Sequence, residues 1–136
     1  MDERNAQDVA DAYVRTTLTF DTRVDAGFDA AQQRAKRWMT QELAAPLATT
    51  QTGDVSGTGW ERLRAADTWT RVATKDLTQA AEKPTKGTAT ERIVQAAVVT
   101  TSKSSKKPKT TTTTLSLTLT RDSARDPWRI SETQTY

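Results

Sequence analysis

The spacing of apolar residues divides the chain into a first part with a helical period and a second part with a period of two. Apolar positions recur every three or four residues through residues 2–21, which predicts an amphipathic helix. The repeating positions are Val9, Tyr13, Thr16 and Phe20. Residues 26–48 are rich in alanine and also read as helix, but they are long for one globular helix. We therefore expect a break at residues 37–40 and a short third helix that ends near Pro46.

Beyond a Thr-, Gly- and Ser-rich loop at residues 49–59, the pattern alternates as it does in strands. The clearest case is residues 110–120, where three leucines occupy one face and hydroxyl side chains the other. A turn or short helix at residues 61–67 precedes the first strand. The four predicted strands are 68–77, 88–102, 110–120 and 128–135. The predicted loops between them are 80–87, 103–109 and 121–127.

Short connections make consecutive strands antiparallel, and the apolar face of such a sheet needs a cover. Only the N-terminal helices can supply it. The sequence therefore predicts an α+β fold in one domain, residues 1–136, with about three helices (about 3–48) packed on a curved four-stranded antiparallel sheet (about 68–136). The side chains expected to face the helices are Trp69, Val98, Leu117 and Trp128.

Composition excludes several kinds of chemistry. The 136 residues include 20 Lys and Arg against 17 Asp and Glu, a formal net charge of +3, and there is no Cys or His. A disulfide, a thiolate nucleophile, a Cys- or His-ligated metal and a His-based triad are all impossible without these side chains. The longest purely apolar run, residues 96–99, is far too short for a membrane-spanning helix. We expect no metal and no cofactor.

Three side chains could serve an enzyme that works without histidine. A carboxylate base and a tyrosine donor, drawn from Tyr13, Asp67 and Asp76, are able to enolise a ketone if they share one site. However, Tyr13 lies on a helix face expected to be core, and both aspartates fall at a turn or a strand end. We expect no catalytic residue and no enzymatic activity.

Four lysines in the predicted hairpin loop 103–109 form a candidate contact surface: Lys103, Lys106, Lys107 and Lys109. Such a finger can touch DNA or an anionic lipid surface. No aromatic residue is interleaved with these lysines, so a base-stacking platform is not supported and specific nucleic-acid binding is not expected. We expect a solvated hairpin tip, because a run of charge usually lies in solvent.

Aromatic residues form a second candidate site. The residues that could line a cavity are Tyr13, Trp38, Trp60 and Trp69. A tryptophan at an alternating position more often belongs to the core, which is the expectation for Trp69 and Trp128. Trp38 and Trp60 flank the loop between helices and sheet and could close an open end of the fold. The run of threonines at residues 110–114 is expected to face solvent.

The order of elements, together with a few residues, resembles the cone-shaped nuclear-transport-factor-2-like (cystatin-like) fold. The segments that carry the resemblance are the helix at residues 13–20, RAKRWMTQELAAPL at 34–47, Gly59-Trp60, and DPWRI at 126–130. The second of these is also similar to envelope-anchored proteins of actinobacterial conjugative elements. The fold is shared by the VirB-type assembly subunit of type IV secretion systems and by mammalian-cell-entry-associated proteins.

This resemblance implies a non-enzymatic scaffold in a conjugative or type IV secretion-like apparatus. Its partners would be other subunits of that complex, with self-association also open. A membrane helix upstream of this chain would anchor the domain on the extracytoplasmic side of the cell membrane. Two alternatives stay open: a cone that binds a small molecule or acts as an enzyme, and an accessory protein of lipid import. An enclosed pocket would favour the cone with a ligand, whereas a filled interior would favour the scaffold.

Overall fold

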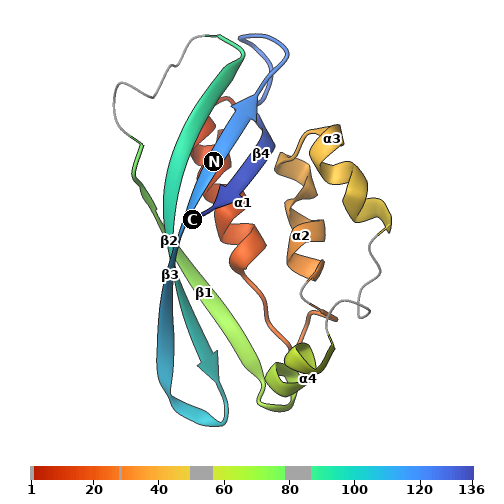
Figure 1. Ribbon diagram of the computed structural model, residues 1–136, viewed down its shortest axis with the longest axis vertical. Coiled ribbons are helices and arrows are strands. Elements are labelled where there is room, and N and C mark those ends of the chain that lie inside the picture. The colour runs from red at the N-terminus through yellow and green to blue at the C-terminus, as the bar shows by residue number, and fades with distance from the viewer. Residues whose placement is uncertain (1, 28, 50–56, 79–86) are drawn as a thin grey trace.

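Helices come first and a sheet follows, as the change of period predicts (Figure 1). The computed structural model describes residues 2–27, 29–49, 57–78 and 87–136. Its helical elements are α1 (Ala6–Leu18), α2 (Asp29–Ala35), the 3₁₀ turns η1 (Lys36–Trp38) and η2 (Ala45–Thr49), α3 (Gln41–Ala44) and α4 (Gly57–Ala65). Its strands are β1 (Thr68–Asp76), β2 (Ala89–Ser102), β3 (Ser105–Thr120) and β4 (Arg129–Thr135).

The four strands form one sheet in the order β1-β2-β3-β4, and every neighbouring pair is antiparallel. Helix α1 lies in the hollow of the curved sheet and contacts all four strands, while α2 and α3 lie outside α1 (Figure 1). The predicted α+β class, with helices on one side of a curved antiparallel sheet, is confirmed. The predicted interior is confirmed in part, because one tryptophan lies on the other face of the sheet.

Helix α1 is shorter than residues 2–21 because its ends are capped. The Asn5 side chain accepts hydrogen bonds from the backbone N–H groups of Gln7 (2.9 Å) and Asp8 (3.2 Å), which begins the helix at Ala6. Thr19 leaves the helix in an extended conformation. Along the buried side of α1, Val9, Ala10, Tyr13 and Val14 are all 4% exposed or less.

The break predicted at residues 37–40 is confirmed, and the sheet explains it. Met39 has extended backbone angles and forms a parallel bridge with Ile130 of β4, and the N–H of Thr40 donates to the carbonyl of Ile130 at 2.9 Å. The Thr40 hydroxyl then caps α3 by accepting from the N–H of Leu43. The helical segment is interrupted because it pairs with the sheet edge at that point. Helix α3 ends at Ala44 and η2 continues through Pro46 to Thr49, so the helical segment ends soon after Pro46, as predicted.

Alternate residues of each strand point to the inner face of the sheet. Leu117, Leu119 and Ile130 have no exposed surface, and Trp128 is 2% exposed. Val98 is half-buried and packs against the same core. Three of the four side chains expected to face the helices therefore do so, namely Val98 of β2, Leu117 of β3 and Trp128, which directly precedes β4.

Trp69 is the exception: the expectation that it faces the helices is wrong. The inward positions of β1 are Thr68 and Thr70, 2% and 7% exposed, so Trp69 points to the other face of the sheet. Threonine is favoured inside because the chain segment after α1 runs along this strand edge. The Thr70 hydroxyl donates to the carbonyl of Leu18 and accepts from the N–H of Phe20, both at 2.9 Å.

The basic hairpin is also built differently from the expectation. Only Lys103 and Ser104 form the turn, and β3 begins at Ser105, so Lys107 and Lys109 belong to a strand and not to a loop. The ladder continues to the pair Ser102–Ser105, with an irregularity between Thr100 and Ser102. The strand is longer because β3 continues to pair with β2 beyond Thr110, and alternate residues of such a pair are hydrogen-bonded across the ladder.

Candidate functional site

The four residues proposed to line a cavity do not come together. Tyr13 (4% exposed) and Trp60 (1%) are buried, and Trp69 lies on the outer face of the sheet. Burial raises the pKa of the Tyr13 phenol, and an interaction with the side chain of Thr133 of β4 opposes the rise. The Trp60 ring packs at 5.6 Å, centre to centre, on that of Phe20. Trp38 lines a surface hollow of the described part.

The three candidate catalytic groups are likewise separated. Asp67 precedes β1 and Asp76 ends it, so eight residues lie between them and their backbone positions are about 30 Å apart along the strand. Asp67 occupies the turn from α4 into β1 with a φ of 48°, and Asp76 accepts from the N–H of Thr78 at 2.8 Å. Tyr13 is enclosed in the core. These residues do not form a site with a base and a donor, because one lies in a turn, one at a strand end and one in the core.

A groove runs between α1 and the α2–η1 segment, with Trp38 in its wall. Its two parts, about 510 Å³ and about 380 Å³, share Arg15, Thr16, Arg37 and Trp38. The groove exists because α2 packs along α1 through alanines, which brings the two helices together and leaves the larger side chains at the rim. Both parts of the groove open at the protein surface, so it offers a place for a partner's side chains and not an enclosed chamber.

Arginines give this groove its electrostatic character. Arg34 is held in an ion pair with Asp25 at 2.6 Å and also donates to the carbonyl of Thr19. Arg37 stacks over the Trp38 ring with its guanidinium carbon 4.8 Å from the ring centre. Arg15 reaches the Thr74 hydroxyl at 3.4 Å. The groove therefore combines an aromatic wall with positive charge, a combination suited to a partner that carries both apolar and acidic groups.

Sequence inspection did not single out Arg15 or Arg37. A signal existed for Arg15, which follows Asp11 at a spacing of four on the exposed side of the first helix. No local signal existed for Arg37, because its position depends on the bridge that interrupts the helix at Met39.

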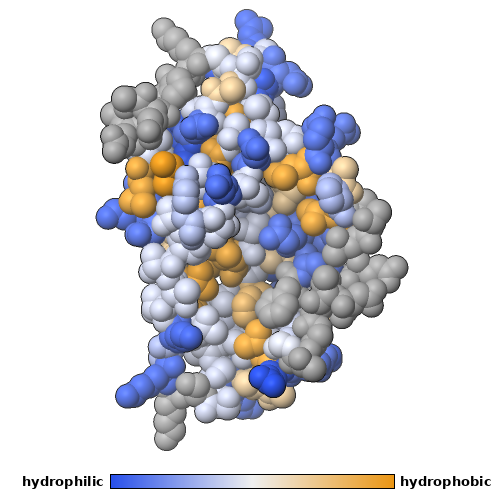
Figure 2. All heavy atoms as spheres, in the orientation of Figure 1, coloured by the Kyte–Doolittle hydropathy of each residue, from blue (hydrophilic) through white to orange (hydrophobic). Residues whose placement is uncertain are grey.

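Apolar surface on the molecule is dispersed. Figure 2 shows small orange patches separated by polar and charged atoms across the face that bears β4, α2 and α3. Val24 is 81% exposed and Leu77 37%. Contacts on this face must therefore combine polar and apolar groups, because no broad hydrophobic patch is available there.

Arg92 is a charged residue on the inner face of the sheet that sequence reasoning also missed. It is 5% exposed, and its guanidinium donates to the Thr90 hydroxyl at 2.7 Å and to the carbonyl of Glu91 at 2.8 Å. Burial lowers the pKa of Arg92, and the charge of Asp76 opposes that effect. The alternation of β2 placed Arg92 on the same face as Val94, which was the available signal.

Two absences apply to the part of the chain that the structure describes. No group of three or more Asp or Glu side chains is arranged there to hold a metal ion. Within the same residues, no helix is long and apolar enough to cross a membrane.

The fold is similar to two solved structures. One is an IcmL-like type IV secretion system protein from Legionella pneumophila, 15% identical, with a TM-score of 0.56 over 94% of this chain and 87% of that one. The other is the periplasmic domain of DotI, 14% identical, with a TM-score of 0.50 over 95% of this chain and 91% of that one. No protein-family model matches the sequence, and no curated protein matches it. The likeness is one of fold.

Proposed function

We propose that this chain is a non-enzymatic extracytoplasmic assembly domain of a type IV secretion-like apparatus, where it holds partner subunits through its surface. The observation that carries the proposal is the fold, which is similar over nearly the whole chain to an IcmL-like type IV secretion system protein and to the periplasmic domain of DotI. The separation of Tyr13, Asp67 and Asp76 also supports a role without catalysis.

The filled interior supports this proposal over a cone that holds a small molecule. Side chains from α1 and from the sheet pack together in one buried cluster. Tyr13, the tyrosine that a ligand-binding cone could use, is 4% exposed and belongs to this cluster. The hollows described above open at the surface, so a ligand would bind on the molecule and not within it.

The finer parts of the proposal come from the sequence resemblance. We place the chain, as one domain, among VirB-type assembly subunits with a nuclear-transport-factor-2-like fold, in a conjugative element of an actinobacterium. A membrane helix upstream would hold it at the extracytoplasmic side of the membrane. Its partners would be other subunits of the transfer complex, and self-association is a further expected mode. A role in lipid import is the competing proposal.

Two surfaces are suited to such contacts. The first is the groove at Trp38, described above. The second is the outer face of the sheet. On β3, Thr110, Thr112 and Ser116 point to this face, whereas the buried leucines of the same strand point to the core. Small hydroxyl side chains on this face can hydrogen-bond another protein, and a hollow lined by Glu91, Ser116 and Glu132 lies beside them.

Site-specific photo-cross-linking in the source bacterium tests the proposal. A photoreactive amino acid replaces Arg37 at the groove or Thr112 on the sheet, and Arg125 at the β3–β4 turn serves as the control position. We expect cross-links from the first two positions to subunits of a secretion or transfer complex, and a loss of transfer when the gene is deleted. Cross-links confined to unrelated proteins, together with unchanged transfer in the deletion strain, would contradict the assembly role.

A further inference from the structure

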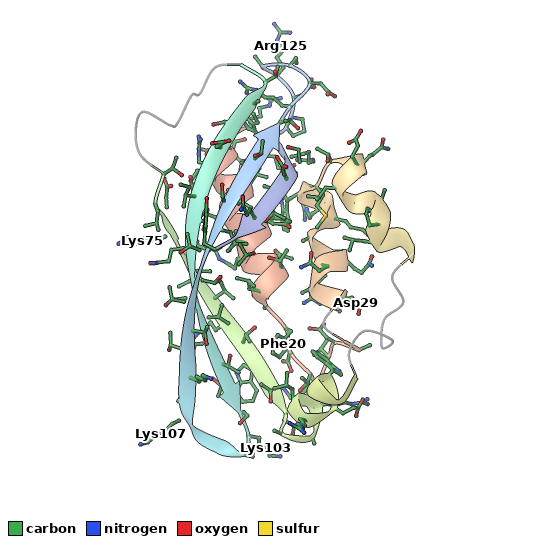
Figure 3. The ribbon with its side chains drawn as sticks, viewed as in Figure 1. Phe20, Asp29, Lys75, Lys103, Lys107 and Arg125 are labelled. Carbon is green, nitrogen blue, oxygen red and sulfur yellow. The ribbon has the colours of Figure 1, made fainter. Side chains whose placement is uncertain are left out.

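The β2–β3 hairpin and helix α4 meet at one end of the molecule. The backbone N–H of Lys103 donates to the carbonyls of Ala66 (3.0 Å) and Asp67 (3.2 Å), which fixes the hairpin turn beside the last turn of α4. Figure 1 shows α4 and the hairpin at the lower end of the molecule, and Figure 3 shows Lys103 and Lys107 on that hairpin. Basic residues that lie about 40 positions apart in the chain are thus brought to one place.

We call residues 57–71 and 101–109 the basic end. They include seven basic residues, which are Arg62, Arg64, Arg71, Lys103, Lys106, Lys107 and Lys109. They include two acidic residues, Glu61 and Asp67, so the basic end carries 7 − 2 = +5. The whole chain carries +3, which leaves 3 − 5 = −2 for all other residues. The positive charge of this protein is therefore concentrated at a single end.

Four basic side chains of the basic end are exposed to solvent, those of Arg62, Arg64, Lys103 and Lys109. In other parts of the molecule, Arg34 and Arg129 pair with carboxylates, at 2.6 Å to Asp25 and at 3.1 Å to Glu3. Like charges held close together repel one another, and an anionic partner relieves that repulsion.

The kind of partner follows from what accompanies these charges. Single-stranded nucleic acid without a defined sequence is generally bound by basic grooves that include aromatic rings for stacking. At the basic end, Trp60 is 1% exposed, and the ring of Trp69 is covered by the Arg23 guanidinium at 4.3 Å. Lysine ammonium groups at the tip of a narrow hairpin suit a surface of diffuse negative charge, such as the headgroups of anionic phospholipids.

We infer that the basic end docks end-on against an anionic phospholipid surface. The attraction comes from α4 and the hairpin together. The sequence alone does not reveal this charged surface. The lysine run by itself is typical of a solvated turn, and the arginines of α4 lie beside the lysines only in the folded chain. The inference does not depend on a secretion role, and it sets one orientation of the domain relative to a bilayer.

Vesicle binding tests this inference with the full chain. The probes are vesicles of phosphatidylcholine with about one third phosphatidylglycerol, and vesicles of phosphatidylcholine alone. We expect binding to the anionic vesicles at low salt, none to the neutral ones, and a steep loss as the screening length shortens to about 8 Å at physiological ionic strength. The triple variant Arg64→Gln/Lys103→Gln/Lys107→Gln should bind roughly tenfold or more weakly.

A matched control separates the site from net charge. The triple variant Arg4→Gln/Lys75→Gln/Arg125→Gln removes the same charge from exposed residues outside the basic end, and it should bind like the wild type. Equal losses in the two variants, or no binding by the wild type, would overturn the inference. Tighter binding to a DNA oligonucleotide than to the anionic vesicles at the same salt would also overturn it. Urea unfolding verifies that both variants are folded, and none of these outcomes bears on the cross-linking test.

Discussion

Buried polar side chains show how single residues hold this fold together. The Thr22 hydroxyl accepts from the N–H of Thr68 at 2.9 Å, and the Thr68 hydroxyl donates to the carbonyl of Leu63 at 2.8 Å. These two bonds connect the segment after α1, the end of α4 and the start of β1. Each threonine satisfies backbone groups that would otherwise lose their water on burial, which is why threonine can replace an apolar residue there.

Leu117 tests the strand register at the level of one residue. It has no exposed surface, so Leu117→Ala should lower the free energy of unfolding by about 2–5 kcal/mol through lost burial and a cavity. Urea denaturation measures this change. Leu77→Ala is the control, because Leu77 is 37% exposed and should lose far less. Similar losses at both positions would contradict the inward orientation of Leu117.

Asp11 should make stability depend on pH. Burial raises the pKa of its carboxyl above 3.8, Asp76 and Asp8 add to the rise, and the hydrogen bond from Gln7 and the charge of Arg15 oppose it. A raised pKa means that the folded state binds this proton more tightly than the unfolded chain does. The contribution of Asp11 to stability therefore falls as pH rises from about 3.8 through the folded pKa.

The variant Asp11→Asn isolates this effect, because its amide oxygen can still accept from Gln7. We expect the variant to be more stable than the wild type at neutral pH, and the difference to shrink as pH falls below 3.8. Unfolding free energies at a series of pH values measure it. A difference that stays constant with pH would show that the Asp11 carboxyl is not the cause.

At the level of elements, the edge of β3 shows how an open strand is protected. Strand β4 pairs with β3 from Leu115 onward, and the N–H of Tyr136 donates to the carbonyl of Thr114. Amide groups of alternate residues point to the same side, so Pro108 lies with its missing N–H on the edge that β4 leaves uncovered. A proline there costs no bond to β2, and it hinders pairing with another chain.

The cap of α1 gives a prediction for an element. Asn5→Ala removes the acceptor for the N–H groups of Gln7 and Asp8, so it should cost about 1 kcal/mol. Thermal unfolding followed by circular dichroism measures the loss. Asn5→Asp keeps an acceptor at the same position and should keep most of the stability. A loss as large in Asn5→Asp as in Asn5→Ala would exclude capping as the cause.

At the level of the whole molecule, stability and surface charge are separate properties. The core lies between α1 and the sheet, whereas the basic end projects beyond it (Figure 3). Changing Lys103, Lys106, Lys107 and Lys109 together to Ser should therefore leave the free energy of unfolding within about 0.5 kcal/mol of the wild type. Urea denaturation measures it, and a larger loss would mean that the hairpin lysines belong to the stabilising structure.

The absence of Cys and His gives a second prediction for the whole molecule. Treatment with a strong chelator should change neither the melting temperature nor the metal content, because the chain has no thiolate or imidazole, the side chains that bind most transition metals in proteins. Elemental analysis before and after chelation measures this. A stoichiometric transition metal that survives the treatment would contradict the prediction.

The order of elements was predictable because the period of apolar residues is a local property of the chain. It predicted helices followed by four strands, the break near Met39 and the inward leucines of β3. It could not place Trp69, because a strand containing Thr68 and Thr70 offers no clear apolar alternation. The inward threonines depend on partners about 50 residues away, such as the carbonyl of Leu18.

The candidate surfaces depended still more on tertiary structure. Trp38 was predicted as a lining residue, but its neighbour Arg15 comes from another helix, and the two meet only when α2 packs along α1. The lysine run was visible in the sequence, whereas its junction with Arg62 and Arg64 required the bond from Lys103 to Ala66. The sequence by itself thus determined the order of helices and strands, through its periodicity, and the chemistry that its composition excludes. Folding decided which distant charges share a surface, because that depends on contacts between elements that no local pattern records.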